Sequence, residues 1–92
     1  MIEKPRRKQD RELIKYIKEE LWCIACGEPS PEAHHVKTRG AGGDDVAKNL
    51  IPVCRRHHNM FHSKGAKYMR ERFEPVNLWF EQIEKIEKEG EQ

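Results

Sequence analysis

All three cysteines and all five histidines of this 92-residue chain lie between residues 23 and 62. A chain this short, with only 36% apolar residues, buries a thin core and usually needs a disulfide, a metal ion or a partner chain to stabilise it. Three cysteines cannot all pair as disulfides, and two of them stand as Cys23-x-x-Cys26, which is metal-ligand spacing. The clustering therefore predicts a fold organised around a metal ion in a reducing, intracellular compartment.

A second pair of ligands follows about thirty residues later, at the start of a predicted helix. Cys54 and His57 are three residues apart and, with Cys23 and Cys26, complete a Cys₃His set, a common closed arrangement for structural zinc. Ordinary buried thiols are the simpler alternative, but they do not account for two pairs with the same spacing. An alternative is that a histidine other than His57 is the fourth ligand of the zinc ion.

The other four histidines divide by geometry. His58 and His62 are four residues apart and share one helix face, whereas His57 lies about 100° away around the helix. His34 and His35, in a predicted strand, point to opposite faces, so one can meet His58 and His62 while the other faces a substrate. His62 as a surface residue and His34 as a hydrogen-bonded core residue are the alternatives. A second metal ion explains the histidines together better.

The hydrophobic pattern predicts an α+β fold in a single domain that spans residues 1–92. We divide it into a basic segment and helix at 1–21, a core at 22–65 and C-terminal helices at 66–92. The expected elements are a helix from the N-cap Asp10 to about Leu21, a turn at 22–27, strands at 32–36 and 49–53, a glycine-rich loop at 39–43, helices at 54–64 and 66–73 separated by Gly65, and a last helix from about Asn77. The expected buried faces are Leu13, Ile14, Ile17 and Leu21 in the first helix and Trp79, Phe80, Ile83 and Ile86 in the last.

The net charge of +2 conceals an uneven distribution. Residues 1–18 carry seven basic and three acidic side chains, and residues 37–72 carry nine basic and three acidic ones. These two blocks would suit a polyanion such as DNA, although solvation of helix faces explains them equally well. The N-terminal residues do not form a signal peptide and no stretch is long enough to span a membrane, so we expect a cytoplasmic protein without membrane contact.

Three runs of this sequence together resemble the motif of HNH nucleases, also called ββα-metal or His-Me finger nucleases. They are EAHHV at 32–36, RGAGGDD at 39–45 and NLIPVCRRHHNMFH at 49–62. The match covers residues 23–65 and implies a small zinc-stabilised ββα core flanked by N- and C-terminal helices. The double histidine resembles the colicin-type branch, and the zinc pairs resemble HNH proteins of phages and bacteria. The resemblance places the protein in a bacterial or phage-infected cell.

The resemblance also implies a role for each residue of the motif. His35 takes the place of the general base, and Asn49 that of the residue that orders the loop and helps to orient the base. His34 and His58 take the places of ligands to a catalytic metal ion, with His62 as a third candidate. Lys37, Arg39, Arg55 and Arg56 are candidates to hold phosphates, although simple solvation is an alternative for each.

These residue types suit phosphodiester hydrolysis. An imidazole has a pKa suited to activating water near neutral pH, and a divalent metal ion can neutralise charge on the phosphate and on the leaving 3′ oxygen. Because imidazole is a softer ligand than carboxylate, an all-histidine site favours Mn²⁺, Co²⁺ or Ni²⁺ over Mg²⁺.

The predicted function is a metal-dependent DNA endonuclease that nicks one strand per active site with low sequence specificity. We expect a monomer or weak homodimer, with a protein partner that supplies targeting. One alternative is a zinc-stabilised nucleic-acid-binding module without activity, and another is a nuclease that acts mainly on RNA. A purely structural zinc adaptor is a third, but it leaves four histidines without a role.

Overall fold

The computed structural model describes residues 8–89. Its elements are α1 (Arg11–Glu20), β1 (Glu32–His35), the short 3-10 helices η1 (Arg39–Ala41) and η2 (Ala47–Asn49), β2 (Leu50–Val53), α2 (Arg55–Arg72) and α3 (Glu74–Glu89). This part of the chain thus has a two-stranded antiparallel sheet and three α-helices, which confirms the predicted α+β class. Among residues 8–89, no helix has the length and apolar character needed to cross a bilayer.

Helix α1 begins where the sequence predicts it. The side chain of Asp10 accepts a hydrogen bond from the backbone N–H of Leu13 at 2.9 Å, which satisfies one of the free donors of the first turn. Ile17 is buried in the core, while Leu13 and Leu21 are half-buried on the same side of the helix. The predicted apolar stripe is therefore the face with which α1 covers the sheet.

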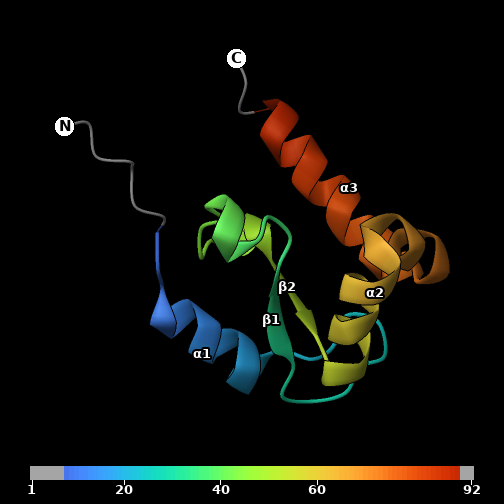
Figure 1. Ribbon diagram of the computed structural model, residues 1–92, viewed down its shortest axis with the longest axis horizontal. Coiled ribbons are helices and arrows are strands. Elements are labelled where there is room, and N and C mark those ends of the chain that lie inside the picture. Colours follow the sequence, from blue (N-terminus) through green and yellow to red (C-terminus); the bar gives the residue numbers. More distant parts are fainter. Residues whose placement is uncertain (1–7, 90–92) are drawn as a thin grey trace.

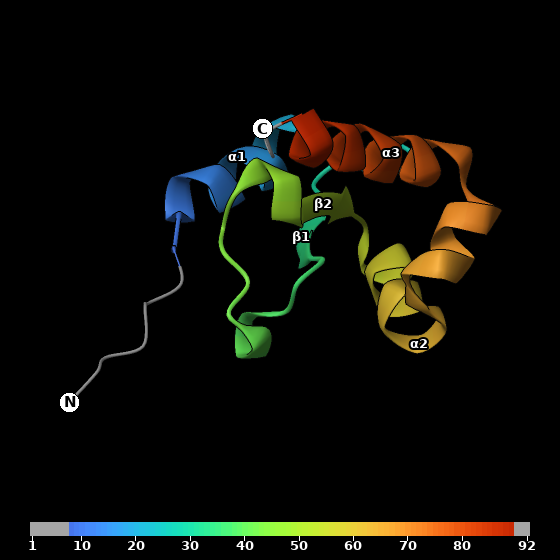
Figure 2. The same cartoon turned by 90° about the horizontal axis from the view of Figure 1, so that it is seen from above.

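The two strands form a hairpin between α1 and α2, as Figures 1 and 2 show from two directions. Their register pairs Glu32 with Val53, His34 with Ile51 and His35 with Leu50. Ile51 and Val53 are fully buried, so β2 forms the centre of the core. The other buried members of this core are Cys23, Cys54, Phe61, Met69, Val76 and Phe80.

The loop between the strands is closed by specific hydrogen bonds. The backbone N–H of Gly43 donates to the Thr38 carbonyl at 2.8 Å, and the N–H of Val36 donates to the Asn49 carbonyl at 2.9 Å. A Cβ atom at Gly43 would lie 1.8 Å from the Lys37 carbonyl oxygen, so this close approach of two backbone segments requires glycine. The glycine-rich loop, expected to be irregular, contains the single 3-10 turn η1.

The C-terminal helices match the prediction in part. Gly65 has a left-handed backbone (φ 85°) that interrupts α2, as expected of a helix terminator. Helix α3, however, begins at Glu74 and not near Asn77. The reason is that Pro75 lies in the first turn, where a missing N–H removes no helical hydrogen bond.

The predicted buried face of the last helix is also only partly correct. Phe80 is buried, and Trp79 and Ile83 are half-buried, but the side chain of Ile86 is 52% exposed. Helix α3 extends beyond the core at its C-terminal end (Figure 1), so the apolar periodicity continues where no other element covers it.

Candidate functional site

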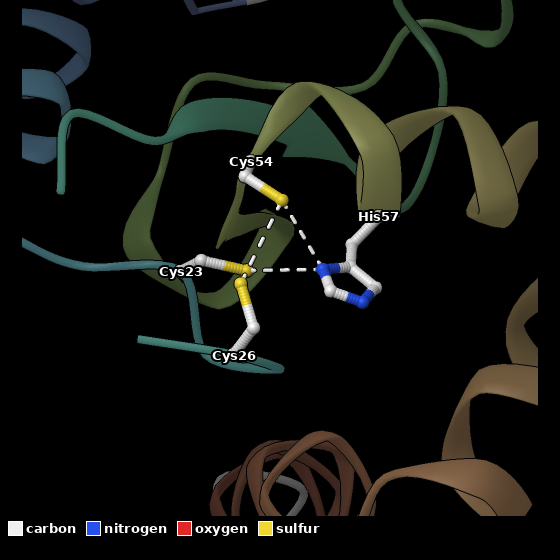
Figure 3. A group of neighbouring side chains, drawn as sticks. All are labelled: Cys23, Cys26, Cys54 and His57. Carbon is white, nitrogen blue, oxygen red and sulfur yellow. Dashed lines mark hydrogen bonds between the residues drawn. The ribbon is translucent and has the colours of Figure 1, made fainter. Parts of the chain in front are cut away.

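Two short segments bring the Cys₃His residues together. Cys23 and Cys26 lie in the turn before β1, which is closed by a hydrogen bond of 2.7 Å from the N–H of Gly27 to the Cys23 carbonyl. Cys54 is the N-cap of α2, and His57 lies in its first turn. Figure 3 shows the three sulfur atoms and one ring nitrogen of His57 turned toward one another.

The distances between these atoms fit a tetrahedral zinc ion. With Zn–S bonds of about 2.3 Å and Zn–N bonds of about 2.0 Å, two sulfur ligands lie roughly 3.8 Å apart and a sulfur and a nitrogen roughly 3.5 Å apart. The Sγ atoms of Cys26 and Cys54 are 3.8 Å apart, and His57 Nδ1 lies 3.6 Å from Cys23 Sγ and 3.1 Å from Cys54 Sγ. All four ligand atoms lie within 4.8 Å of one another, so this group could hold a zinc ion.

The pKa values of the thiols are also consistent with a metal site. Burial raises the pKa of Cys23, but backbone hydrogen bonds from Cys54, Cys26 and Ala25 outweigh it and hold this pKa below its usual value. Cys26 receives a backbone hydrogen bond from Glu28 that lowers its pKa, yet burial and the two neighbouring thiols raise that pKa to about 11. Three thiols this close cannot all ionise without a cation, and a zinc ion held by this group would supply that charge.

Three further histidines form a second group, with two of its members on a different face of α2 from His57. His34 of β1 and His58 and His62 of α2 each offer a ring nitrogen within 4.8 Å of the others, so this group too could hold a metal ion. The ring of His34 stacks on Phe61 at a centroid distance of 4.6 Å and meets His58 and His62 edge-on at 5.0 and 5.1 Å. His57 and His58 are neighbours in the sequence, but they point about 100° apart around α2 and therefore belong to different groups.

His34 is buried, and its pKa is low. Burial, followed by the nearby rings of His58, His62 and His35, lowers its pKa to about 4, so the ring is neutral at physiological pH. Its Nδ1 atom is buried and, within residues 8–89, has no hydrogen-bond partner. A buried polar atom without a partner is costly and calls for an explanation, and a bound ion is one that fits the neighbouring histidines.

A carboxylate fixes the orientation of His58. The Nδ1–H of His58 donates to Glu32 Oε1 at 2.8 Å, which leaves Nε2 available as a ligand. This hydrogen bond, together with Arg55, lowers the pKa of Glu32, although burial opposes it. A carboxylate on the far nitrogen of a histidine is the usual support of a metal ligand. Glu32 was not among the residues predicted from the sequence, although it lies two residues before His34 and so on the same face of β1.

His35, the predicted base, is held by a carboxylate as well. Its Nε2–H donates to Asp45 Oδ1 at 2.7 Å, and the second oxygen of Asp45 accepts the backbone N–H of Asp10 at 2.9 Å. Sequence reasoning missed Asp45 and gave the orienting role to Asn49. The only available signal was an acidic pair at the end of the glycine-rich loop.

Asn49 instead closes the loop. Its side chain accepts the N–H of Lys37 at 2.7 Å and donates to the carbonyls of Lys37 and Asp44 at 3.1 and 3.0 Å. These hydrogen bonds tie Asn49 to both ends of the loop that carries Asp45.

The cleft beside these histidines has a volume of about 460 Å³. It is lined by Ala33, His34, His35, Thr38, Arg39, Gly40, His58 and His62. Of the four predicted phosphate-binding cations, Arg39 lines this cleft, whereas Arg55 pairs with Glu32 at 2.9 Å. Lys37 is exposed on the loop, and Arg56 lies close enough to His57 to lower its pKa, after the larger effect of burial.

Fold and site thus define a small α+β protein with a Cys₃His group able to hold zinc. The chain belongs to the family described as "Protein of unknown function (DUF968)", whose sequence profile matches residues 1–90.

One curated relative is "Uncharacterized protein YdfU" from Escherichia coli (strain K12), which is 36% identical over 44 residues. This similarity covers 45% of the chain and 13% of the relative, so the chain corresponds to a small part of that protein. No solved structure matches the chain.

Proposed function

We propose that this protein is a metal-dependent endonuclease of the HNH type that hydrolyses phosphodiester bonds in DNA. The observation that carries the proposal is one cleft that contains both a group of three histidines and a separate histidine fixed by a carboxylate. The order β1, β2, α2 is also the order of elements that the resemblance implies. In this proposal the Cys₃His group binds structural zinc and the fold depends on it.

His35 acts as the general base. Because its Nε2–H is donated to Asp45, Nδ1 carries the lone pair and can accept a proton from an attacking water. His34 lies one residue earlier in β1, in a group that lines the same cleft, so the base and one of the metal ligands share one strand. Arg39, at the wall of this cleft, is positioned to bind the scissile phosphate or one beside it.

The group His34, His58 and His62 would hold the catalytic ion. A divalent metal ion supplies neutralisation of charge on the phosphate and on the leaving 3′ oxygen. Glu32 and Phe61 serve this group by fixing the rings of His58 and His34. Within residues 8–89 this group includes no carboxylate ligand, which favours Mn²⁺, Co²⁺ or Ni²⁺ over Mg²⁺.

Nicking of a supercoiled plasmid tests the proposal. The zinc-loaded protein is assayed with each of these four metal ions and with a chelator, beside the variants His35→Ala and His58→Ala. Asn59→Ala is the matched control, because Asn59 is exposed on α2 next to His58. We expect open circles with the wild type and the control, and a loss of about 10²–10⁴-fold in rate for His35→Ala, the usual contribution of a general base.

Two results would contradict the proposal. Absence of nicking with every metal ion would leave a zinc-stabilised nucleic-acid-binding module, and nicking by folded His35→Ala at the wild-type rate would reject the assigned base. A parallel assay on RNA tests the choice of substrate. If the protein cleaves RNA faster than DNA, its proposed substrate is RNA.

A further inference from the structure

We propose that Asp45 is the positioning residue of the active site, which sets the orientation and the tautomer of His35, and that residues 8–10 hold Asp45 in place. The inference rests on the proposed function, because it concerns the base of that reaction. It goes beyond it by assigning a role to a loop carboxylate and to the segment that leads into α1.

The contacts of Asp45 connect three parts of the chain. Its two carboxylate oxygens accept the Nε2–H of His35 at 2.7 Å and the backbone N–H of Asp10 at 2.9 Å. Its own backbone N–H donates to the Lys8 carbonyl at 2.8 Å. Asp45 is only 4% exposed, so these contacts are shielded from water. The end of β1, the loop and the start of α1 therefore meet at one side chain.

The chemistry of this contact requires a carboxylate. Asp45 receives two N–H donors, and a carboxylate can accept both because each of its oxygens is an acceptor. An asparagine has one acceptor oxygen and one donor nitrogen, so it can satisfy only one of these two donors. If its oxygen stays on the N–H of Asp10, its nitrogen faces His35 and favours the tautomer with the proton on Nδ1. That tautomer has no lone pair on Nδ1 and cannot act as the base.

The neighbouring residue provides a matched control. The side chain of Asp44 also accepts a backbone N–H from the N-terminal segment, that of Lys8. Its donor is thus the main chain and not a histidine, and an asparagine keeps an acceptor oxygen for this N–H. The same substitution at this position therefore removes a negative charge from the loop without altering the ring of His35. Comparing Asp45→Asn with Asp44→Asn separates positioning of the base from the loss of a carboxylate charge in the loop.

The test combines kinetics with the NMR signature of the ring. In the zinc-loaded full chain, two-bond ¹H–¹⁵N correlation spectra of His35 at mildly alkaline pH report which ring nitrogen carries the proton. We expect Nε2–H in the wild type and in Asp44→Asn, and a shift toward Nδ1–H in Asp45→Asn. In the nicking assay we expect Asp45→Asn to lower kcat by about 10²–10⁴-fold, the size of a lost or misoriented base, with little change in KM for DNA.

The outcomes distinguish the inference from the proposed function. If the wild type nicks DNA and folded Asp45→Asn nicks at the same kcat, the inference is wrong and the nuclease assignment stands. An Nδ1–H ring in the wild type would also overturn the inference, and this measurement does not depend on whether Asp45→Asn folds. Failure of the wild type to nick would overturn both.

Discussion

The loop between the strands depends on the side chain of Asn49, and the substitution Asn49→Asp tests this dependence with almost no change in shape. The amide nitrogen donates to the carbonyls of Lys37 and Asp44 at 3.1 and 3.0 Å, while the amide oxygen accepts the N–H of Lys37. A carboxylate retains the acceptor but sets a negatively charged oxygen against two carbonyl oxygens. Two hydrogen bonds of about 0.5–1.5 kcal/mol each are lost, so the free energy of unfolding should fall by about 1–3 kcal/mol near neutral pH.

The pH dependence gives this prediction a sign. The two carbonyls disfavour the ionised form, so the pKa of the introduced carboxyl should be higher in the folded protein than in the unfolded chain. The destabilisation is then complete at neutral pH and decreases in mild acid, where the protonated group can donate one hydrogen bond again. Urea unfolding at fixed zinc concentration measures it, with Asn49→Ala as a comparison that loses all three side-chain hydrogen bonds without introducing a charge. Equal stability of Asn49→Asp and wild type near neutral pH would refute the proposed closure of the loop.

Two further substitutions test the loop and the histidine group. Gly43→Ala should lower the free energy of unfolding by about 3 kcal/mol, since its Cβ would overlap the Lys37 carbonyl, and the melting temperature measures this against Gly40→Ala, whose Cβ meets no atom within 4 Å. Equal melting temperatures of Gly43→Ala and Gly40→Ala would show that the loop accommodates the added methyl group without loss of stability. Glu32→Gln should weaken Mn²⁺ binding about 10–100-fold, the usual effect of losing a carboxylate that supports a histidine ligand, whereas Glu71→Gln, at an exposed position of α2, should leave it unchanged. Calorimetric titration of the zinc-loaded variants measures both affinities, and unaltered binding by Glu32→Gln would count against the role of that carboxylate.

The sequence allowed the two ligand groups to be separated because their spacing reflects local geometry. Cys23 and Cys26 are close along a turn, and His57 and His58 differ by a fixed rotation around α2. Such relations depend on a few residues and hold in almost any fold. The N-cap at Asp10 and the break at Gly65 were predictable for the same reason.

The carboxylates at Glu32 and Asp45 could not be predicted in this way. Their hydrogen bonds to His58 and His35 span 26 and 10 residues, and they depend on how the loop folds back and on where α1 begins. The start of α3 was misplaced because Pro75 breaks a helix in its interior but not in its first turn. The exposure of Ile86 depends on where the core ends, which periodicity along one helix does not reveal.

The most direct measurement of the division between the two ligand groups is anomalous diffraction from crystals grown with zinc and soaked with Mn²⁺. Data collected on either side of the zinc and manganese absorption edges identify each ion separately. We expect zinc among Cys23, Cys26, Cys54 and His57, and manganese among His34, His58 and His62, with the ring of His35 still on Asp45. A cysteine group without zinc, or manganese bound away from the three histidines, would contradict the account.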